Sequence, residues 1–233
     1  MKILAVIPAR GGSKSIKNKN MSIIKGKPLI YYTINEAMKS KLITDIVVSS
    51  DDEKIINYSL KLGALAPFKR PKNLSTDNAL SAPVVYHALE FMERLQKINY
   101  DLVIMLQPTS PFRKVKHIDE SLELIIKKNY DSLVSVVNVD GYHPFRMKTF
   151  FEENLLNFIE QGFEDMRPRQ QLPKVYIRNG AIYIVKSEFL KNKKTLVAQK
   201  CLGYEMNHKE SVNIDNEVDL IVSRTIMENR DNA

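Results

Sequence analysis

The sequence predicts an α/β fold, in which an open sheet is covered by helices. The first observation is an apolar run at residues 3–7, typical of a buried strand, which Pro8 stops because proline cannot donate to a sheet ladder. The second is that similar runs alternate along the chain with segments of helical periodicity. The third is size, since 233 residues, 44% of them apolar, suffice for one large domain. We therefore expect residues 1–233 to form a single domain.

Each further element is expected from its own pattern. Pro28 suits the first turn of a helix, and Asp51 or Asp52 can cap a second helix that Gly63 ends. The apolar faces that we expect in the first and the last helix are Leu29, Ile30, Ile34 and Ala37, and Val218, Ile221, Val222 and Thr225. Further strands are predicted at 46–49, 64–68, 102–106, 132–139 and 179–185, and further helices at 82–97 and 118–126. Residues 188–200 show no clear pattern.

The loop after the first strand has the chemistry of a phosphate-binding loop. Gly11 and Gly12 leave the backbone free to adopt positive φ and to bring its N–H groups close to an anion. The loop's positive charges are Arg10, Lys14, Lys17 and Lys19, and Asn20 adds an amide. The Walker loop and the dinucleotide-binding fingerprint are both absent. Because open α/β sheets bind ligands at the carboxyl ends of their strands, the loop indicates an anionic ligand.

Composition narrows the classes of partner. The net charge of +8 favours either polyphosphate substrates or nucleic acid. The basic residues are spread along the chain and interleaved with acids, which favours the polyphosphate and predicts no nucleic-acid partner. The single cysteine, Cys201, excludes an internal disulfide and a cysteine-based metal site. The start is too short for a signal peptide and no run approaches a membrane span, so we expect a cytoplasmic protein.

At this point the residues carry a resemblance. Ile7-Pro-Ala-Arg-Gly-Gly-Ser-Lys14, followed by Lys19-Asn20, resembles the opening of the sugar-activating cytidylyltransferases, specifically the CMP-sialic acid synthetase (acylneuraminate cytidylyltransferase) family. Later stretches extend the resemblance over nearly the whole chain. It implies a Rossmann-like, three-layer α/β/α nucleotidyltransferase sheet, similar to glycosyltransferase-A folds. It also implies that residues 140–175, which lack a helical period, build a dimerisation lobe of a homodimer.

The resemblance also implies a nucleotide site around the first loop. In it Arg10 and Lys14 hold the phosphates, and the other expected contacts with the nucleotide are Ala9, Gly11, Lys19, Asn20, Arg70 and Ser81. Without the resemblance, Arg70 would be a surface arginine and Ser81 a helix cap. No nucleophilic side chain is expected, because a phosphoryl-type transfer needs mainly positioning and charge neutralisation.

A second set of residues is implied for the sugar. Gln107, in a Gln-Pro-Thr-Ser-Pro turn, is placed against the acceptor sugar, and this turn lacks the Asp-x-Asp metal pair of ordinary glycosyltransferases. Arg146 and Arg169 would reach the sugar pocket across the dimer interface, since a guanidinium binds a carboxylate bidentately; the alternative is surface salt bridges. Tyr183 either lines the sugar pocket or belongs to the core. His143 is expected to be structural.

The expected cofactor is Mg²⁺. The family has two aspartates, two residues apart, where this chain has Asn213 and Asp215. Asp215 keeps a carboxylate for the metal, whereas Asn213 is a neutral ligand at the first position, which argues against two bound ions. The alternative role for Asp215 is a cap on the last helix.

These expectations give one reaction. CTP and an acidic nine-carbon sugar of the sialic type would give the CMP-sugar and diphosphate. Legionaminic, pseudaminic and 3-deoxy-octulosonic acids are alternative acceptors, although the Gln107 turn favours the sialic-acid branch over the octulosonate one. A non-catalytic protein that binds nucleotides or nucleic acid is the alternative of another class, and Asn213 lends it some support.

Overall fold

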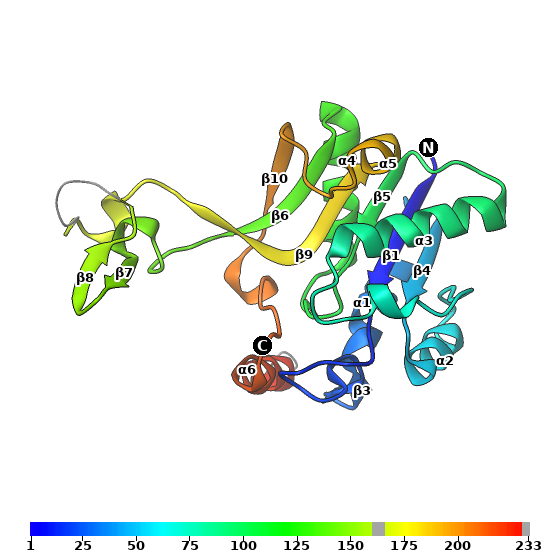
Figure 1. Ribbon diagram of the computed structural model, residues 1–233, viewed down its shortest axis with the longest axis horizontal. Coiled ribbons are helices and arrows are strands. Elements are labelled where there is room, and N and C mark those ends of the chain that lie inside the picture. The colour runs from blue at the N-terminus through cyan, green and yellow to red at the C-terminus, as the bar shows by residue number, and fades with distance from the viewer. Residues whose placement is uncertain (160–165, 230–233) are drawn as a thin grey trace.

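A six-stranded sheet forms the centre of the protein. The computed structural model describes residues 1–159 and 166–229. The strand order is β10-β6-β9-β5-β1-β4, in which β9 runs antiparallel to both of its neighbours and the other pairs are parallel (Figure 1). The strands are β1 (Ile3–Pro8), β4 (Asp45–Ser49), β5 (Leu102–Met105), β6 (Ser132–Asn138), β9 (Tyr176–Lys186) and β10 (Cys201–Glu205).

Helices cover both faces of this sheet. They are α1 (Leu29–Met38), α2 (Glu53–Lys61), α3 (Ser81–Gln96), α4 (Val115–Lys128) and α5 (Ser187–Lys193), whereas the last helix, α6 (Glu217–Asn229), packs in a separate small core with Ile24 and Leu29. Alternate side chains of β1 enter two separate cores: Ile3 and Ile7 pack with residues of α1, α2 and α4, whereas Leu4 and Val6 pack with α3 and α5. This confirms the three-layer α/β/α prediction. Among the described residues, no helix has the length and apolar character that crossing a membrane requires.

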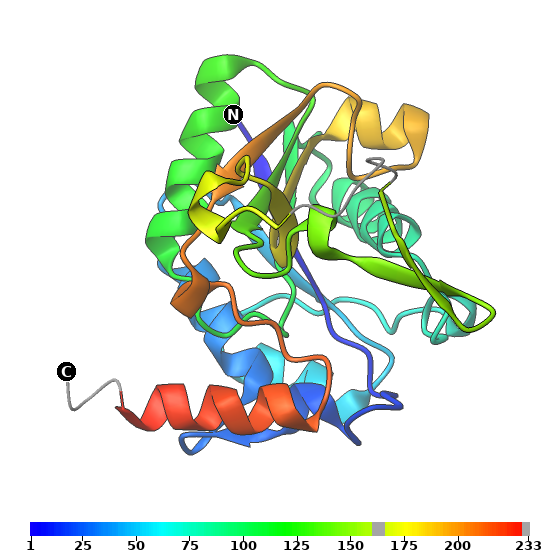
Figure 2. The same cartoon turned by 90° about the vertical axis from the view of Figure 1, so that its left-hand side faces the viewer.

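The last helix packs through a different face from the one predicted. Leu220, Ser223 and Met227 are buried, whereas Val218 and Ile221 are 67% and 60% exposed. The helix lies beside the small β2–β3 hairpin, Ile23–Ile24 and Lys27–Pro28, as both views show (Figures 1 and 2). Its sequence carries two apolar stripes, so periodicity alone could not tell which one packs.

Two further expectations need correction. Residues 64–68 do not form a strand; Leu65 makes one isolated bridge to Val47 of β4, and Lys69, just after this range, makes another to Ser50. Residues 188–200, which showed no pattern, lie largely in α5 and in the turn before β10, a strand the sequence did not predict. The cap of α2 is settled as Asp52, whose carboxylate accepts from the backbone N–H groups of Lys54 and Ile55.

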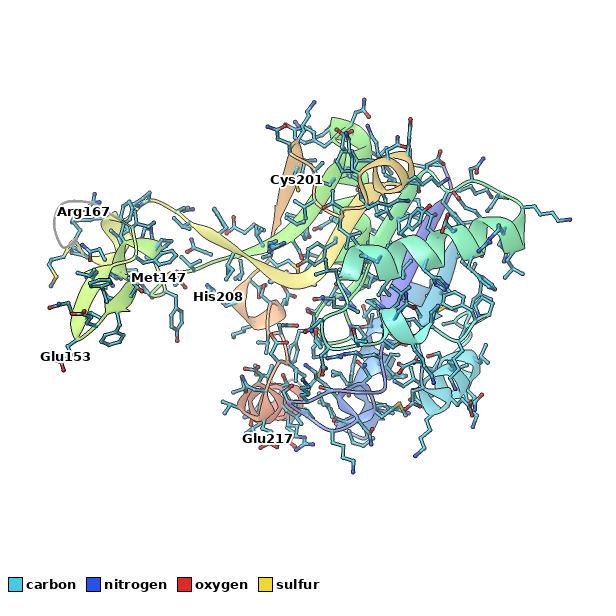
Figure 3. The ribbon with its side chains drawn as sticks, viewed as in Figure 1. Met147, Glu153, Arg167, Cys201, His208 and Glu217 are labelled. Atoms are coloured by element: carbon cyan, nitrogen blue, oxygen red, sulfur yellow. The ribbon has the colours of Figure 1, made fainter. Side chains whose placement is uncertain are left out.

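Residues 140–159 and 166–175 leave the body of the protein. Between β6 and β9 the chain forms the short helices η3 (Pro144–Arg146) and η4 (Arg169–Gln171) and a hairpin of β7 (Lys148–Phe151) and β8 (Asn154–Asn157). We call this segment the lobe; it projects from the sheet, and Met147, Glu153 and Arg167 mark it in Figure 3. Many of its large apolar side chains are exposed, for example Phe150 at 75% and Phe151 at 65%, whereas Leu172 is buried. Exposed apolar surface of this kind is typical of an interface.

Candidate active site

A cavity of about 380 Å³ opens where β1 and β5 end. It is lined by Pro8, Arg10, Ser13, Lys14, Ser15, Lys19, Asn20, Arg70, Leu74, Thr76, Asp77, Ala79, Ser81, Val84, Gln107, Pro108 and Thr109. These residues come from the first loop, the segment before α3 and the turn after β5. The structure therefore brings together most of the residues predicted for the nucleotide, at the sheet edge where α/β folds bind ligands.

Two of the predicted phosphate ligands share one carboxylate. Arg10 Nη1 lies 2.6 Å from Asp77 Oδ1, and Lys14 Nζ lies 3.0 Å from Asp77 Oδ2. The hydrogen bonds from Lys14 and Arg10 hold the pKa of Asp77 below its ordinary value, so this carboxyl is ionised. Sequence reasoning did not single out Asp77, because nothing in a polar loop tells which acid faces the cations.

Gly11 has a different role from the one predicted. Among the described residues, the glycines with positive φ are Gly26, Gly63 and Gly180, so Gly11 and Gly12 do not use that freedom. The Gly11 N–H donates to Asp51 Oδ1 at 2.9 Å, and a Cβ on Gly11 would lie 2.7 Å from the Asp52 side chain. Gly11 is thus required by the close approach of the loop to the start of α2. Ala9 is buried and does not line the cavity, since its N–H group donates to Ser49.

Lys19 and Asn20 fix the base of the loop. Asn20 is buried, and its amide donates to the carbonyl of Arg10 at 2.9 Å. Lys19 Nζ donates to the carbonyl of Ile214 at 2.9 Å and lies 3.7 Å from Asp215 Oδ1. Lys19 therefore ties the first loop to the segment before α6, which brings Asp215 close to this loop.

Arg70 is a buried arginine and not a surface one. It is 5% exposed; its Nε donates to Ser49 Oγ at 3.0 Å, and Nη2 donates to the Ser49 carbonyl. Burial lowers its pKa to about 10, so the guanidinium stays charged at neutral pH. Ser81 is the first residue of α3 rather than its cap, and its hydroxyl makes no hydrogen bond with the described residues. Both side chains face the cavity.

A second cavity, of about 460 Å³, adjoins the first, and Gln107 lines both. The residues that line it are Gln107, Val137, Ile177, Arg178, Asn179, Gly180, Tyr183, Ser211, Asn213 and Asp215. Tyr183 is half-buried; it lines this cavity and also packs against the core on the α3 side. Arg178 was not predicted; its side chain is exposed and makes no ion pair within the described residues.

A buried arginine stabilises the turn that carries Gln107 by donating hydrogen bonds to backbone carbonyls. Arg113 is 1% exposed, and its Nη1 donates to the carbonyls of Gln107 and Ala181, at 3.2 and 2.7 Å. Burial lowers its pKa to about 9. Gly180 has a φ of +78°, and a Cβ there would lie 2.7 Å from Gln107 Oε1. The Gln107 side chain therefore lies against bare backbone, between the two cavities.

The comparison with known protein families identifies the family to which this chain belongs. A model of the cytidylyltransferases, described as "Cytidylyltransferase", matches residues 4–222. The chain belongs to the cytidylyltransferase family. It is an enzyme family, and the resemblance to the acylneuraminate branch is confirmed by the relatives described next.

Three relatives illustrate the branch to which this cytidylyltransferase is similar. It is 33% identical to the CMP-N,N'-diacetyllegionaminic acid synthase of Legionella pneumophila, over 98% of this chain and 97% of that one. It is 39% identical to the pseudaminic acid cytidylyltransferase of Campylobacter jejuni, over 78% of each. It is 34% identical to the N-acylneuraminate cytidylyltransferase of Streptococcus agalactiae, over 95% of this chain and 52% of that one.

Solved structures agree with the fold. The structure of CMP:2-keto-3-deoxy-manno-octonic acid synthetase complexed with CTP has a TM-score of 0.72 to this cytidylyltransferase, covering 98% of this chain and 99% of that one. Their sequence identity is 18%, so the likeness concerns the fold. It confirms the predicted nucleotidyltransferase sheet.

The residues present fit one Mg²⁺ ion. Asp215 is 70% exposed at its side chain and lines the second cavity beside Lys19. Asn213 Nδ2 donates to Asp215 Oδ2 at 2.7 Å, so the amide presents its hydrogen atoms, not its oxygen, to this carboxylate. The described residues contain no group of three or more metal-binding side chains. Because Mg²⁺ is commonly held by one or two carboxylates with substrate phosphates and water, Asp215 suffices for one ion.

The alternative cap role of Asp215 is not seen. Asn216 Oδ1 accepts from the N–H group of Asp219, and Asp219 Oδ2 accepts from the N–H groups of Asp215 and Asn216. The start of α6 is thus stabilised by Asn216 and Asp219, which leaves the Asp215 carboxylate to Asn213 and Lys19.

The lobe residues lie apart from both cavities in this chain. Arg146 Nη2 donates to the carbonyl of Arg167 at 2.8 Å, and Arg169 is an exposed residue of η4; neither lines a cavity. His143 is 3% exposed, and its two ring nitrogens meet the Phe145 N–H and the Pro173 carbonyl. His143 is therefore structural, as expected.

Proposed function

We propose that the protein transfers the CMP group of CTP to an acidic nine-carbon sugar of the sialic type and releases diphosphate. The observation that carries this proposal is the pair of adjoining cavities that share Gln107: one is lined by cations, and the other by polar side chains together with Tyr183. A nucleotide in the first and a sugar in the second would meet at Gln107. Legionaminic, pseudaminic and octulosonic acids remain alternative acceptors, since relatives with the first two in their names are as similar as the acylneuraminate enzymes.

The first loop would supply charge to the transfer. The oxygen of the sugar's anomeric 2-hydroxyl attacks the α-phosphorus of CTP while the bond to the bridging oxygen breaks. The hydroxyl gives up its proton to solvent water, and diphosphate leaves with the electron pair of the broken bond. Arg10 and Lys14, which already hold an anionic carboxylate, would stabilise the growing charge on the leaving diphosphate. Lys19 and Asn20 would keep the loop in place, while Arg70 and Ser81 would position the nucleoside.

Asp215 would hold Mg²⁺ next to these cations. The ion, completed by phosphate oxygens and water, would supply further neutralisation of phosphate charge. Lys19 lines the first cavity and Asp215 the second, so their ion pair lies at the boundary of the two cavities, which supports this role. Asn213 would contribute orientation, through its hydrogen bond to Asp215, and not a second charge.

The acceptor would be held from the second cavity. Gln107 is fixed by Gly180 and, through its backbone, by Arg113, which suits a side chain that must recognise a substrate without moving. Arg178 offers a guanidinium for the carboxylate of an acidic sugar within the same chain. Arg146 and Arg169 would add to the recognition of that carboxylate from a partner subunit.

The lobe would form the contact of a homodimer. Many of its large apolar side chains are exposed, which is the pattern of an interface. Among them are Tyr142, Phe150, Phe151, Leu155, Phe158 and Met166. A C2 dimer would place the lobe of one subunit over the sugar cavity of the other. Because the reaction consumes CTP, we place the protein in the cytoplasm.

A substrate panel tests this function. The purified protein is incubated with MgCl2, one of the four nucleoside triphosphates, and one of four acidic sugars: N-acetylneuraminic, legionaminic, pseudaminic or 3-deoxy-octulosonic acid. We expect diphosphate release with CTP and a nine-carbon acid, and almost none when either is omitted. Release with octulosonic acid alone would assign the chain to the other acceptor class. The absence of release with every sugar, together with salt-sensitive oligonucleotide binding, would contradict the enzymatic proposal.

A further inference from the structure

Asp77 occupies the position at which a phosphate group would be expected. It lies between η2 (Lys72–Leu74) and α3, and each of its carboxylate oxygens meets a different cation, Arg10 at 2.6 Å and Lys14 at 3.0 Å. These are the two cations assigned to the triphosphate. A carboxylate and a phosphate group compete for such donors because both present planar or tetrahedral sets of anionic oxygens to the same N–H groups.

The contact has little to do with holding the fold together. The side chains of Arg10 and Asp77 are about one third exposed and that of Lys14 is 85% exposed, so the ion pairs are screened by water. Within the described residues, the Asp77 carboxylate accepts from these two cations and from no other group. Removing the charge of Asp77 should therefore change the cations' availability far more than the protein's stability.

We propose that Asp77 is an internal competitor of phosphate groups for Arg10 and Lys14. This inference rests on the proposed function, because it takes the two cations as the triphosphate site. A ligand must displace the carboxylate before it can use both cations, so weak anions such as inorganic phosphate are kept out while a triphosphate with a metal ion still binds. After the transfer, the returning carboxylate competes with the diphosphate product and shortens its stay.

The expected size of the effect follows from the population of the open state. A ligand's apparent affinity is proportional to the fraction of protein molecules whose binding groups are free. Breaking two exposed ion pairs of this kind costs a free energy that weakens the binding of a displacing anion by about fivefold to tenfold. Asp77→Asn keeps the shape of the side chain and removes its charge, so it should raise the affinity for every displacing anion by that factor.

The experiment compares the unmodified protein with Asp77→Asn and with a matched control, Asp131→Asn. Asp131 makes an exposed ion pair with Lys186, at 3.1 Å, and lines neither of the two cavities of the candidate site. Dissociation constants for sodium diphosphate and inorganic phosphate are measured by titration calorimetry without nucleotide or sugar. The inhibition constant of added diphosphate against CTP is measured in an assay that follows CMP-sugar formation by chromatography and not diphosphate release.

The result that supports the proposal is a fivefold to tenfold tighter binding of both anions by Asp77→Asn, with a matching fall in the inhibition constant of diphosphate and no change in Asp131→Asn. Unchanged or weaker anion binding by Asp77→Asn would overturn it, since Asp77 would then orient Arg10 and Lys14 without competing for them. The proposed function fails separately: it is lost if the unmodified protein forms no CMP-sugar from CTP, whatever Asp77→Asn does to anion binding.

Discussion

The sheet body and the lobe differ in the exposure of their apolar side chains. In the body, β1 sends alternate side chains into two cores, and residues such as Leu4 and Leu89 are fully buried. In the lobe, the β7–β8 hairpin carries Phe150, Phe151 and Leu155 with more than half of each side chain exposed. An isolated two-stranded hairpin is at most marginally stable in water. The body therefore buries its own apolar side chains, whereas we propose that a partner subunit covers those of the lobe.

The largest expected effect compares stability in the two regions. Leu89→Ala, in the core of α3, should lower the free energy of unfolding by about 2–5 kcal/mol because it leaves a cavity. Leu155→Ala, which is 58% exposed, should change it by less than about 0.5 kcal/mol when the protein is dilute. Urea unfolding at micromolar and at tenfold lower protein concentrations measures both. Equal losses for the two variants would mean that the lobe has a core of its own.

The next effect concerns the chemistry of the body. Lys14→Ala should lower kcat by orders of magnitude, about 3 kcal/mol in the barrier, because it removes a charge contact to the leaving group. Lys17→Ala is the matched control, since Lys17 belongs to the same loop and does not line the cavity. Initial rates of CMP-sugar formation are compared at saturating CTP. Near-normal turnover of Lys14→Ala would remove this lysine from the reaction.

The metal side chain gives a smaller effect. Asp215→Asn should weaken Mg²⁺ activation by about 10–100-fold, since it replaces the carboxylate with a neutral amide. Asn213→Asp should do the reverse and tighten Mg²⁺, because it sets a second carboxylate beside the first. Rates are followed across a magnesium titration. An Asp215→Asn enzyme with an unchanged titration curve would rule out the assigned role, and an unchanged curve for Asn213→Asp would mean that this side chain does not face the ion.

The smallest effect tests whether the lobe completes the site of a partner subunit. Lys14→Ala disables the cavity of its own subunit and Arg169→Ala disables the lobe, so a mixed dimer would retain one complete site. Random exchange of subunits between the two inactive variants should restore about a quarter of the normal activity. The control pairs Lys14→Ala with Arg178→Ala, both of which alter the body cavities, and should restore none. Equal recovery in the two mixtures would contradict a lobe that acts across the interface.

Much of the site could be predicted because many of its residues lie close together in short stretches of the sequence. The apolar run before Pro8 and the charges of the first loop predicted an anion site at the end of β1, and the cavity lies there. The helical face of Leu29, Ile30, Ile34 and Ala37 was predicted correctly, since a single apolar stripe leaves one way to pack. The family resemblance added Arg70, Ser81 and Gln107, which no periodicity could have connected.

What the sequence determined by itself is therefore local: most strands, most helices, and the identity of the charged residues beside them. Only the tertiary structure decided which groups meet. It set Asp77 between Arg10 and Lys14, brought Lys19 to Asp215 across most of the chain, and turned α6 so that Leu220 rather than Val218 is buried. The physical reason is that such contacts join residues far apart in the chain, so they depend on how layers pack and not on any local preference.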